Sequence, residues 1–333
     1  MKWAYLIFIT LFLNSACNEQ KNETIKESKI SSPSLNKANE EIAKKPNDAN
    51  LYFVRGIIYH DLKQDSLALK DLEKAISLDS NQAKFYSAIG DILFEHKDIS
   101  SSTAWIKKAI EKDPNDPKAH LKIAKMFLFD NDYAKAFVEL NTVLRADVYN
   151  AEAYFLKGMC YKYMKDTAKA LSNFQTAVQT NPKYYDAFMQ LGVLYDEKND
   201  RIAIQYFENA RKIDTLNLEP LYAQAMFFQK RNEFAEAKKL FRRALKINKD
   251  YALAFYNTGW MLLQEDSTEK AIREFERAIN VKPDYAEAYY NKGLCHEILG
   301  NYKQAFADYG QALEFNNDLE MCKTAEKRVK AKM

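Results

Sequence analysis

The feature that constrains this chain most is a small residue that recurs about every 34 positions. Six of the eight glycines follow this period, and alanine stands at the two places where glycine is skipped. The eight residues are Gly56, Gly90, Ala124, Gly158, Gly192, Ala225, Gly259 and Gly293. Successive members lie 34 residues apart, except that 33 separate Gly192 from Ala225. A fixed period of this length predicts an array of similar small units that stack on one another.

The period divides most of the chain into eight repeats when the small residue is numbered position 8. The repeats are 49–82, 83–116, 117–150, 151–184, 185–217, 218–251, 252–285 and 286–319. The fifth repeat is one residue short, and we place the missing residue in its inter-helix turn, between Tyr195 and Ala203.

Three further positions follow the same period. Position 20 holds alanine except at Ser102, and position 27 holds alanine except at Val143. Position 24 holds a large residue in every repeat: Leu72, Ile106, Leu140, Phe174, Phe207, Phe241, Phe275 and Tyr309. Positions 4, 8 and 11 share one face of a first helix, and positions 20, 24 and 27 share one face of a second. Each repeat is therefore predicted to be a helical hairpin, in which small residues let two backbones approach and the residue at position 24 fills the space beyond.

This pattern resembles the tetratricopeptide repeat family over residues 49–319, although His296 occupies a position that is usually aromatic. The resemblance implies an all-α fold, a right-handed superhelical solenoid of eight helix-turn-helix repeats with terminal capping helices. Apolar residues before the first repeat predict an N-terminal capping segment over residues 34–48. Met321 and Val329, on an otherwise polar stretch, predict a C-terminal solvating helix over residues 320–333.

Composition and motifs argue against nucleic-acid binding and catalysis. The chain has 49 Lys and Arg against 46 Asp and Glu, a balance unlike that of a strongly basic nucleic-acid binder. Its four histidines fall in four repeats without the spacing of metal ligands on one element, and its four cysteines are too scattered for a disulfide scaffold. No phosphate-binding loop or nucleophile motif is present in the sequence. We therefore expect no enzyme activity, no cofactor and no metal.

The N-terminus predicts a lipid anchor. Lys2 precedes an apolar run from Trp3 to Leu13, which is too short to span a bilayer comfortably, and Ser15-Ala16-Cys17 follows. The segment resembles the lipobox of bacterial lipoproteins, although Leu13 lies one place early. The resemblance implies a signal peptide over residues 1–16 and lipidation of Cys17, the first residue of a flexible stalk over 17–33. An ordinary cleaved signal and an uncleaved anchor are the alternatives.

If the hairpins stack as the resemblance implies, the first helices form a concave groove into which positions 5 and 9 point. From the fourth repeat onward both positions are apolar or aromatic throughout, whereas the family often places a polar residue at position 9. These residues, hereafter the groove row, are Phe155, Met159, Met189, Val193, Tyr222, Met226, Tyr256, Trp260, Tyr290 and Leu294. They predict a partner-binding surface. The alternative is that they pack between neighbouring hairpins or beneath the chain's own terminus.

Acidic residues predominate at the predicted rim of this groove. They are Glu152, Asp186, Asp196, Glu197, Glu219, Glu287 and Glu297. An apolar floor with an acidic rim favours a basic amphipathic helix or an extended segment with apolar anchors. The alternative interpretation of these charges is solvation of the groove edge.

The resulting prediction is a membrane-tethered interaction scaffold of the bacterial cell envelope that binds a segment of a partner protein. We expect it at the outer membrane facing the periplasm, with the inner membrane and the cell surface left open. The competing hypothesis is a glycan-binding accessory subunit of an outer-membrane uptake complex, because aromatic rings also stack on sugars. That function requires rings on one ledge together with amide and carboxylate partners, and usually large insertions, of which the repeats have none.

Overall fold

The structure is a computed structural model that describes residues 33–333. The predicted signal peptide, Cys17 and the stalk up to residue 32 lie outside the described residues. Among the helices described, none is both long enough and apolar enough to cross a membrane.

The described chain forms two units, one ending at His96 and the other beginning at Lys97. The first contains α1 (Pro33–Lys44), α2 (Ala49–Asp61), α3 (Asp65–Leu78) and α4 (Ala83–Glu95). Each of these helices packs against the next one along the chain. The boundary between the units falls in the inter-helix turn of the second repeat.

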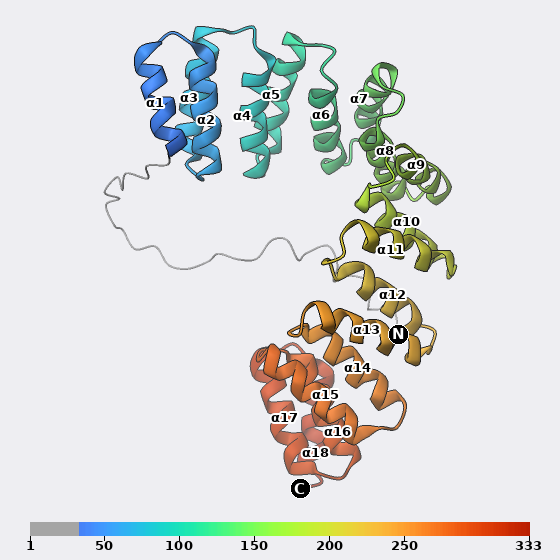
Figure 1. The fold of residues 1–333 in the computed structure, drawn as a ribbon. Coiled ribbons are helices and arrows are strands. Elements are labelled where there is room, and N and C mark those ends of the chain that lie inside the picture. Colours follow the sequence, from blue (N-terminus) through green and yellow to red (C-terminus); the bar gives the residue numbers. More distant parts are fainter. Residues whose placement is uncertain (1–32) are drawn as a thin grey trace. The chain divides into compact units, whose positions relative to one another are not determined.

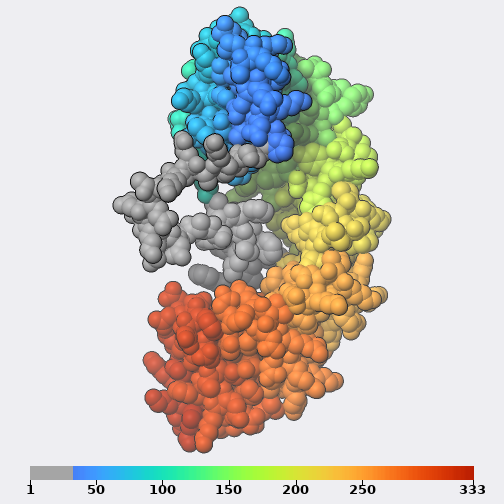
Figure 2. All heavy atoms as spheres, turned by 60° about the vertical axis from the view of Figure 1, so that its left-hand side comes forward, coloured from blue at the N-terminus to red at the C-terminus, as the bar shows by residue number. Residues whose placement is uncertain are grey.

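The second unit is a row of helical hairpins, and successive helices pack against one another from α5 to α18 (Figure 1). Figure 2 shows its orange-to-red part as a close-packed block of atoms. Its helices are α5 (Ile99–Lys112), α6 (Pro117–Phe129), α7 (Tyr133–Ala146), α8 (Ala151–Tyr163), α9 (Thr167–Thr180), α10 (Tyr185–Glu197), α11 (Ile202–Ile213), α12 (Glu219–Gln229), α13 (Phe234–Ile247), α14 (Ala252–Gln264), α15 (Thr268–Val281), α16 (Ala286–Ile298), α17 (Tyr302–Phe315) and α18 (Glu320–Lys330). Residues 33–333 contain helices and no strand, which confirms the predicted all-helical solenoid class.

The core consists of the small and large residues that the period singles out. Every residue at positions 20, 24 and 27 is at most 1% exposed. The close approach at position 8 is clear in the fourth repeat, where a Cβ added to Gly158 would lie 2.6 Å from the ring of Phe174. An added Cβ at Gly259 would lie 2.9 Å from Phe275. The large ring therefore fits only because position 8 carries a very small residue.

The turn between the two helices of each repeat contains one residue with positive φ, always at position 15. These residues are Lys63, Lys97, Asn131, Lys165, Asn199, Asn232, Asp266 and Gly300, with φ between 56° and 75°. Only the last is glycine, the residue that adopts this conformation without strain, and Asn and Asp tolerate it better than most. The lysines explain why a search for glycine does not find these turns in the sequence.

The one-residue deletion of the fifth repeat shortens the start of its second helix. Asn199 keeps the positive φ of the turn, and Asp200 follows it, as an aspartate does in the second to fourth repeats. Helix α11 then begins only at Ile202, one residue before the buried Ala203, and has 12 residues against 14 in most second helices. The side chain of Asp200 accepts a hydrogen bond from the Ile202 amide at 2.9 Å, which satisfies one amide at this shortened end.

The C-terminal helix α18 packs on α17 through a small apolar face. Cys322, Ala325 and Val329 are fully buried, whereas Met321 is 60% exposed. Of the two apolar residues noted in the sequence, only Val329 therefore belongs to the packed face. Cys322 is a free thiol, as are Cys160 and Cys295.

Candidate functional site

The groove row lies on the first helices of five consecutive hairpins, α8, α10, α12, α14 and α16. Each of these helices contributes one residue from position 5 and one from position 9. Two residues four apart share a helix face, so each pair forms one patch of the same surface. The whole row belongs to the second unit.

The aromatic rings at position 5 of the row are half-buried, and they pack against other rings of the solenoid. In the fourth repeat, the Phe155 ring lies 5.6 Å from Phe174 of its own hairpin and 5.1 Å from Tyr184. The centroids of Tyr222 and Phe241 are 6.2 Å apart, and those of Tyr290 and Tyr309 are 5.7 Å apart. Position 5 therefore stabilises the hairpin through its contact with position 24.

The position-9 side chains of the row make fewer contacts between aromatic rings than the position-5 side chains do. Met159, Val193, Met226, Trp260 and Leu294 are all half-buried. Trp260 makes an edge-to-face contact with Phe234 at a centroid distance of 6.1 Å. These five side chains retain accessible surface along the row.

Solvent exposure of the row is lower than a fully open groove requires. Met189 is buried at 6% exposure, and the other nine residues are half-buried. Packing between hairpins thus accounts for part of the row, most clearly at position 5. The part that stays accessible is the candidate contact surface for a ligand.

Three of the seven predicted rim carboxylates form ion pairs within the chain. Glu152 lies 2.5 Å from the ammonium of Lys125, and Asp196 lies 2.6 Å from that of Lys230. Glu297 pairs with Arg328 of α18. The other four, which are exposed, are Asp186, Glu197, Glu219 and Glu287. The rim is therefore less negative than the sequence alone indicates.

Glu297 is the most strongly perturbed of these carboxylates. The Arg328 guanidinium donates two hydrogen bonds of 2.7 Å to its two oxygens, and the Tyr309 hydroxyl donates a third at 2.9 Å. These bonds, that of Arg328 first, lower the pKa of Glu297 to about 2. This carboxylate fixes the C-terminal helix and is not free to contact a partner.

Tyrosines and asparagines link successive repeats along the C-terminal half of the row. The Asn291 amide donates to the Tyr256 hydroxyl at 3.0 Å and to the Glu287 carbonyl at 3.0 Å. One repeat earlier, a hydrogen bond joins Asn257 to the hydroxyl of Tyr222. This ladder is not among the features predicted from the sequence, although its spacing of 35 residues, from position 5 to position 6 of the next repeat, is visible in the period.

The same region gathers further phenol groups. The rings of Tyr256 and Tyr285 lie 4.9 Å apart, and Tyr251 packs in the same cluster as Tyr222. Burial, together with nearby carboxylates and phenols, raises the pKa of Tyr256 to about 12 and also raises that of Tyr285 and Tyr251. These phenols are neutral at any physiological pH.

The structure brings two histidines together that the sequence analysis treated as separate. His60 Nδ1 lies 2.7 Å from one oxygen of Asp65, and His96 Nε2 lies 2.7 Å from the other. Glu95 lies 3.4 Å from the second nitrogen of His60. Within residues 33–333, however, no group of His, Cys, Asp and Glu has the arrangement of a metal site.

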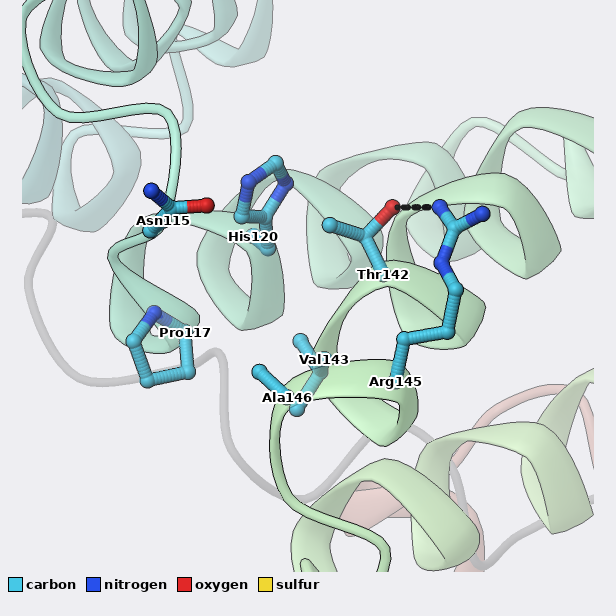
Figure 3. A pocket seen from close by; sticks show the side chains of 7 residues that line it. All are labelled: Asn115, Pro117, His120, Thr142, Val143, Arg145 and Ala146. Carbon is cyan, nitrogen blue, oxygen red and sulfur yellow. Dashed lines mark hydrogen bonds between the residues drawn. The ribbon is translucent and has the colours of Figure 1, made fainter.

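His120 occupies the position-4 place of the third repeat and lines a cavity of about 350 Å³ between α6 and α7 (Figure 3). Its Nε2 lies 3.0 Å from the carbonyl oxygen of Pro114, six residues earlier in the chain. In the first two repeats, the hydroxyls of Tyr52 and Tyr86 donate a hydrogen bond to the carbonyl at the same separation. Its Nδ1 lies 2.6 Å from Glu139. His120 thus serves the same structural bond as the tyrosines.

A second cavity, of about 460 Å³, lies at the corresponding place in the fifth repeat. It is lined by Pro182, Lys183, Phe188, Asn209, Lys212 and Ile213. Neither cavity is lined by a residue of the groove row. Both belong to the loop edge of their hairpins, where the position-4 side chain meets the end of the second helix.

Comparison with known sequence families and structures identifies the repeats. Family models described as tetratricopeptide repeat match residues 151–184 and 286–319, and residues 49–82 and 218–251. A model described as TPR repeat matches residues 259–297. The chain therefore contains tetratricopeptide repeats, which generally mediate protein–protein interactions and are typically not enzymes.

Two solved structures show the same fold. One is a tetratricopeptide repeat protein from Parabacteroides merdae, 15% identical with a TM-score of 0.50, covering 75% of this chain and 99% of that one. The other is the C-terminal part of a TPR repeat-containing protein from Cytophaga hutchinsonii, 19% identical with a TM-score of 0.50, covering 66% of this chain and 91% of that one. No curated protein sequence matches the chain.

Proposed function

We propose that this protein is a membrane-tethered scaffold of the bacterial cell envelope that binds a segment of a partner protein along the groove row. The observation that carries the proposal is the unbroken series of half-buried apolar side chains at position 9 of five consecutive repeats. Accessible apolar side chains in a continuous series are typical of protein interaction surfaces.

The chemistry of position 9 suits an adaptable partner. Met159 and Met226 are flexible and polarizable. Trp260 has a large ring, which makes an edge-to-face contact with Phe234. Tryptophan and methionine are enriched at interfaces because they bury large apolar areas. The accessible part of this row would bind apolar anchors of the partner.

The tether is proposed from the N-terminal sequence. Lipidation of Cys17 would attach the repeats to a membrane through acyl chains, each buried CH₂ contributing about 0.8 kcal/mol. The residues from there to the first helix would act as a spacer. We propose the outer membrane, facing the periplasm, as the location.

A glycan-binding function is supported by one observation and opposed by another. In the sixth to eighth repeats, tyrosines lie near the amides of Asn257 and Asn291, and a carboxylate lies near each of Tyr251 and Tyr256. Sugars, however, stack on open ring faces, and the ring of Tyr256 packs against both Phe275 and Tyr285. We therefore favour a protein segment as the ligand.

The experiment that tests the proposal is affinity capture of envelope proteins by the full chain and by two folded triple variants. The groove variant carries Met159→Glu, Met226→Glu and Trp260→Glu. The matched control carries Val138→Glu, Ile202→Glu and Ile247→Glu, which replace exposed apolar residues outside the row. A partner that binds the wild type and the control variant but not the groove variant supports the proposal. Equal capture by all three proteins contradicts it.

A further inference from the structure

Four rim carboxylates of the second unit are exposed and form no ion pair within the described residues, and two of these lie on the sixth to eighth repeats. They are Glu219, at position 2 of the sixth repeat, and Glu287, at position 2 of the eighth. Glu219 accepts one hydrogen bond from the Tyr185 hydroxyl at 3.1 Å. In contrast, Glu152 and Glu297, on the same rim, are neutralised by Lys125 and Arg328. These two carboxylates are therefore available to external cations.

The surface between the two carboxylates contains no competing charge on the groove row. Leu253 occupies position 2 of the intervening repeat, and the row there consists of Tyr256 and Trp260. The Tyr256 phenol is neutral, because its pKa is raised to about 12 by burial first and by Glu287 next. An apolar and aromatic stretch thus separates two negative charges.

The spacing of the carboxylates follows from the repeat. Packed helices lie about 8 to 10 Å apart, so equivalent positions two layers apart are separated by roughly 16 to 20 Å. An extended chain advances about 3.3 Å per residue, and five or six residues cover that distance. The same span along a helix would need about 11 to 13 residues at 1.5 Å each.

We propose that the partner segment over the sixth to eighth repeats is extended and carries two Lys or Arg side chains five or six residues apart, with a large apolar residue between them. One cation pairs with Glu219 and the other with Glu287. The apolar residue contacts the accessible surface of Leu253 and Tyr256, which lie at positions 2 and 5 of the intervening repeat. This inference rests on the proposed function and specifies the chemistry of its ligand through charge complementarity with the rim.

Both ion pairs would form at a partly solvated rim. Exposed pairs contribute about 0.2 to 1 kcal/mol each, so the loss of both reduces affinity by roughly two- to thirtyfold. Added salt weakens the same pairs, because the Debye length falls from about 10 Å at 0.1 M to about 3 Å at 1 M.

The test is selection of binders to the full chain from a random library of 12-residue peptides. The expected result is enrichment of peptides with two basic residues at the stated spacing and a large apolar residue between them. Glu219→Gln with Glu287→Gln should weaken the selected peptides by roughly tenfold. The control variant carries Glu269→Gln and Glu276→Gln, at exposed residues of α15, the second helix of the seventh repeat. It should bind the selected peptides with unchanged affinity.

The outcomes separate this inference from the proposed function. Peptides that lack the basic pair, or whose affinity is the same for the Glu219 and Glu287 double variant, overturn the inference. If such peptides still lose binding to the Met159, Met226 and Trp260 variant, the proposed groove function stands without it. If no peptide is enriched on the wild type, both are contradicted.

Discussion

The carboxylate of Glu297 on α16 accepts two parallel hydrogen bonds of 2.7 Å from the guanidinium of Arg328 on α18. This bidentate pair joins the last repeat to the C-terminal helix and withdraws one acidic group from the candidate groove. A bidentate Arg–carboxylate pair has a defined geometry and is stronger than a single exposed ion pair. The relationship explains why a C-terminal helix with few apolar residues stays attached to the solenoid.

The first prediction is an acid-sensitive C-terminal helix. The pKa of Glu297 is lowered from 4.5 to about 2, so its contribution to stability is complete above pH 4.5 and is lost as the pH falls toward 2. Because Arg328 is nearly half exposed, we discount the contribution to about 1 to 2 kcal/mol. The protection factors of the α18 amides, which correct hydrogen exchange for the intrinsic rate at each pH, should fall over this pH range in the wild type.

Glu297→Gln is the matching variant for this pH test. It should accelerate α18 exchange at pH 7 and should remove most of the acid dependence of the α18 protection factors between pH 4.5 and pH 2. Unchanged exchange of α18 in the variant at neutral pH would show that the apolar contacts of Val329 and Cys322 hold the helix alone.

The second prediction concerns His60 in the first unit. Hydrogen bonding to Asp65, followed by the Glu95 charge, raises the pKa of His60 above 6.5 against the opposing effect of burial. Its contribution to stability is therefore fully present below pH 6.5 and is lost as the pH rises through the raised value. The protection factors of the α2 and α3 amides, which correct hydrogen exchange for the intrinsic rate at each pH, should be higher at pH 6 than at pH 8.5. Asp65→Asn should abolish most of this difference, and a difference that persists would contradict the assignment to this pair.

The third prediction tests the packing register. Ala237, at position 20 of the sixth repeat, is fully buried between two helices. Ala237→Leu should lower the free energy of unfolding by roughly 1 to 3 kcal/mol through overpacking. Ala235→Leu, at an exposed position on the same helix, is the control and should change it by less than about 0.5 kcal/mol. Equal melting temperatures of the two variants would contradict the register.

The fourth prediction concerns the tether. Cys17→Ser should move the protein from the membrane fraction to the soluble fraction if the lipobox is functional, since acylation requires the thiol. Fractionation of cells expressing each form, with a blot against the repeats, measures the change. A variant that stays in the membrane fraction at full length would instead support an uncleaved N-terminal anchor.

The sequence predicts the fold well because one physical requirement recurs eight times. A ring or aliphatic side chain at position 24 needs a small residue at positions 8 and 20, and Phe174 against Gly158 shows that requirement in atomic terms. The structural effect of a deletion in a single repeat, such as the late start of α11, is not predictable from the sequence. One missing residue could fall at several places in the turn, and the structure shows which helix end it shortens.

The candidate site is less predictable because it depends on contacts between repeats. Tyr256 counts as a groove residue by its position, and the structure shows that it also packs on Phe275 and Tyr285. Glu297 counts as a rim charge by its position, and Arg328, 31 residues later, neutralises it. Helical periodicity gives the direction of a side chain but not which distant residue meets it.

Site-specific photo-cross-linking in cells tests whether the groove row contacts the partner. A photoreactive phenylalanine analogue would replace Val193 or Leu294 in the groove row, or Val138, which is 61% exposed and lies outside it. We predict that Val193 and Leu294 cross-link to the same envelope protein and that Val138 does not. Cross-links to that protein from Val138 alone would place recognition on another face and would contradict the groove as the binding site.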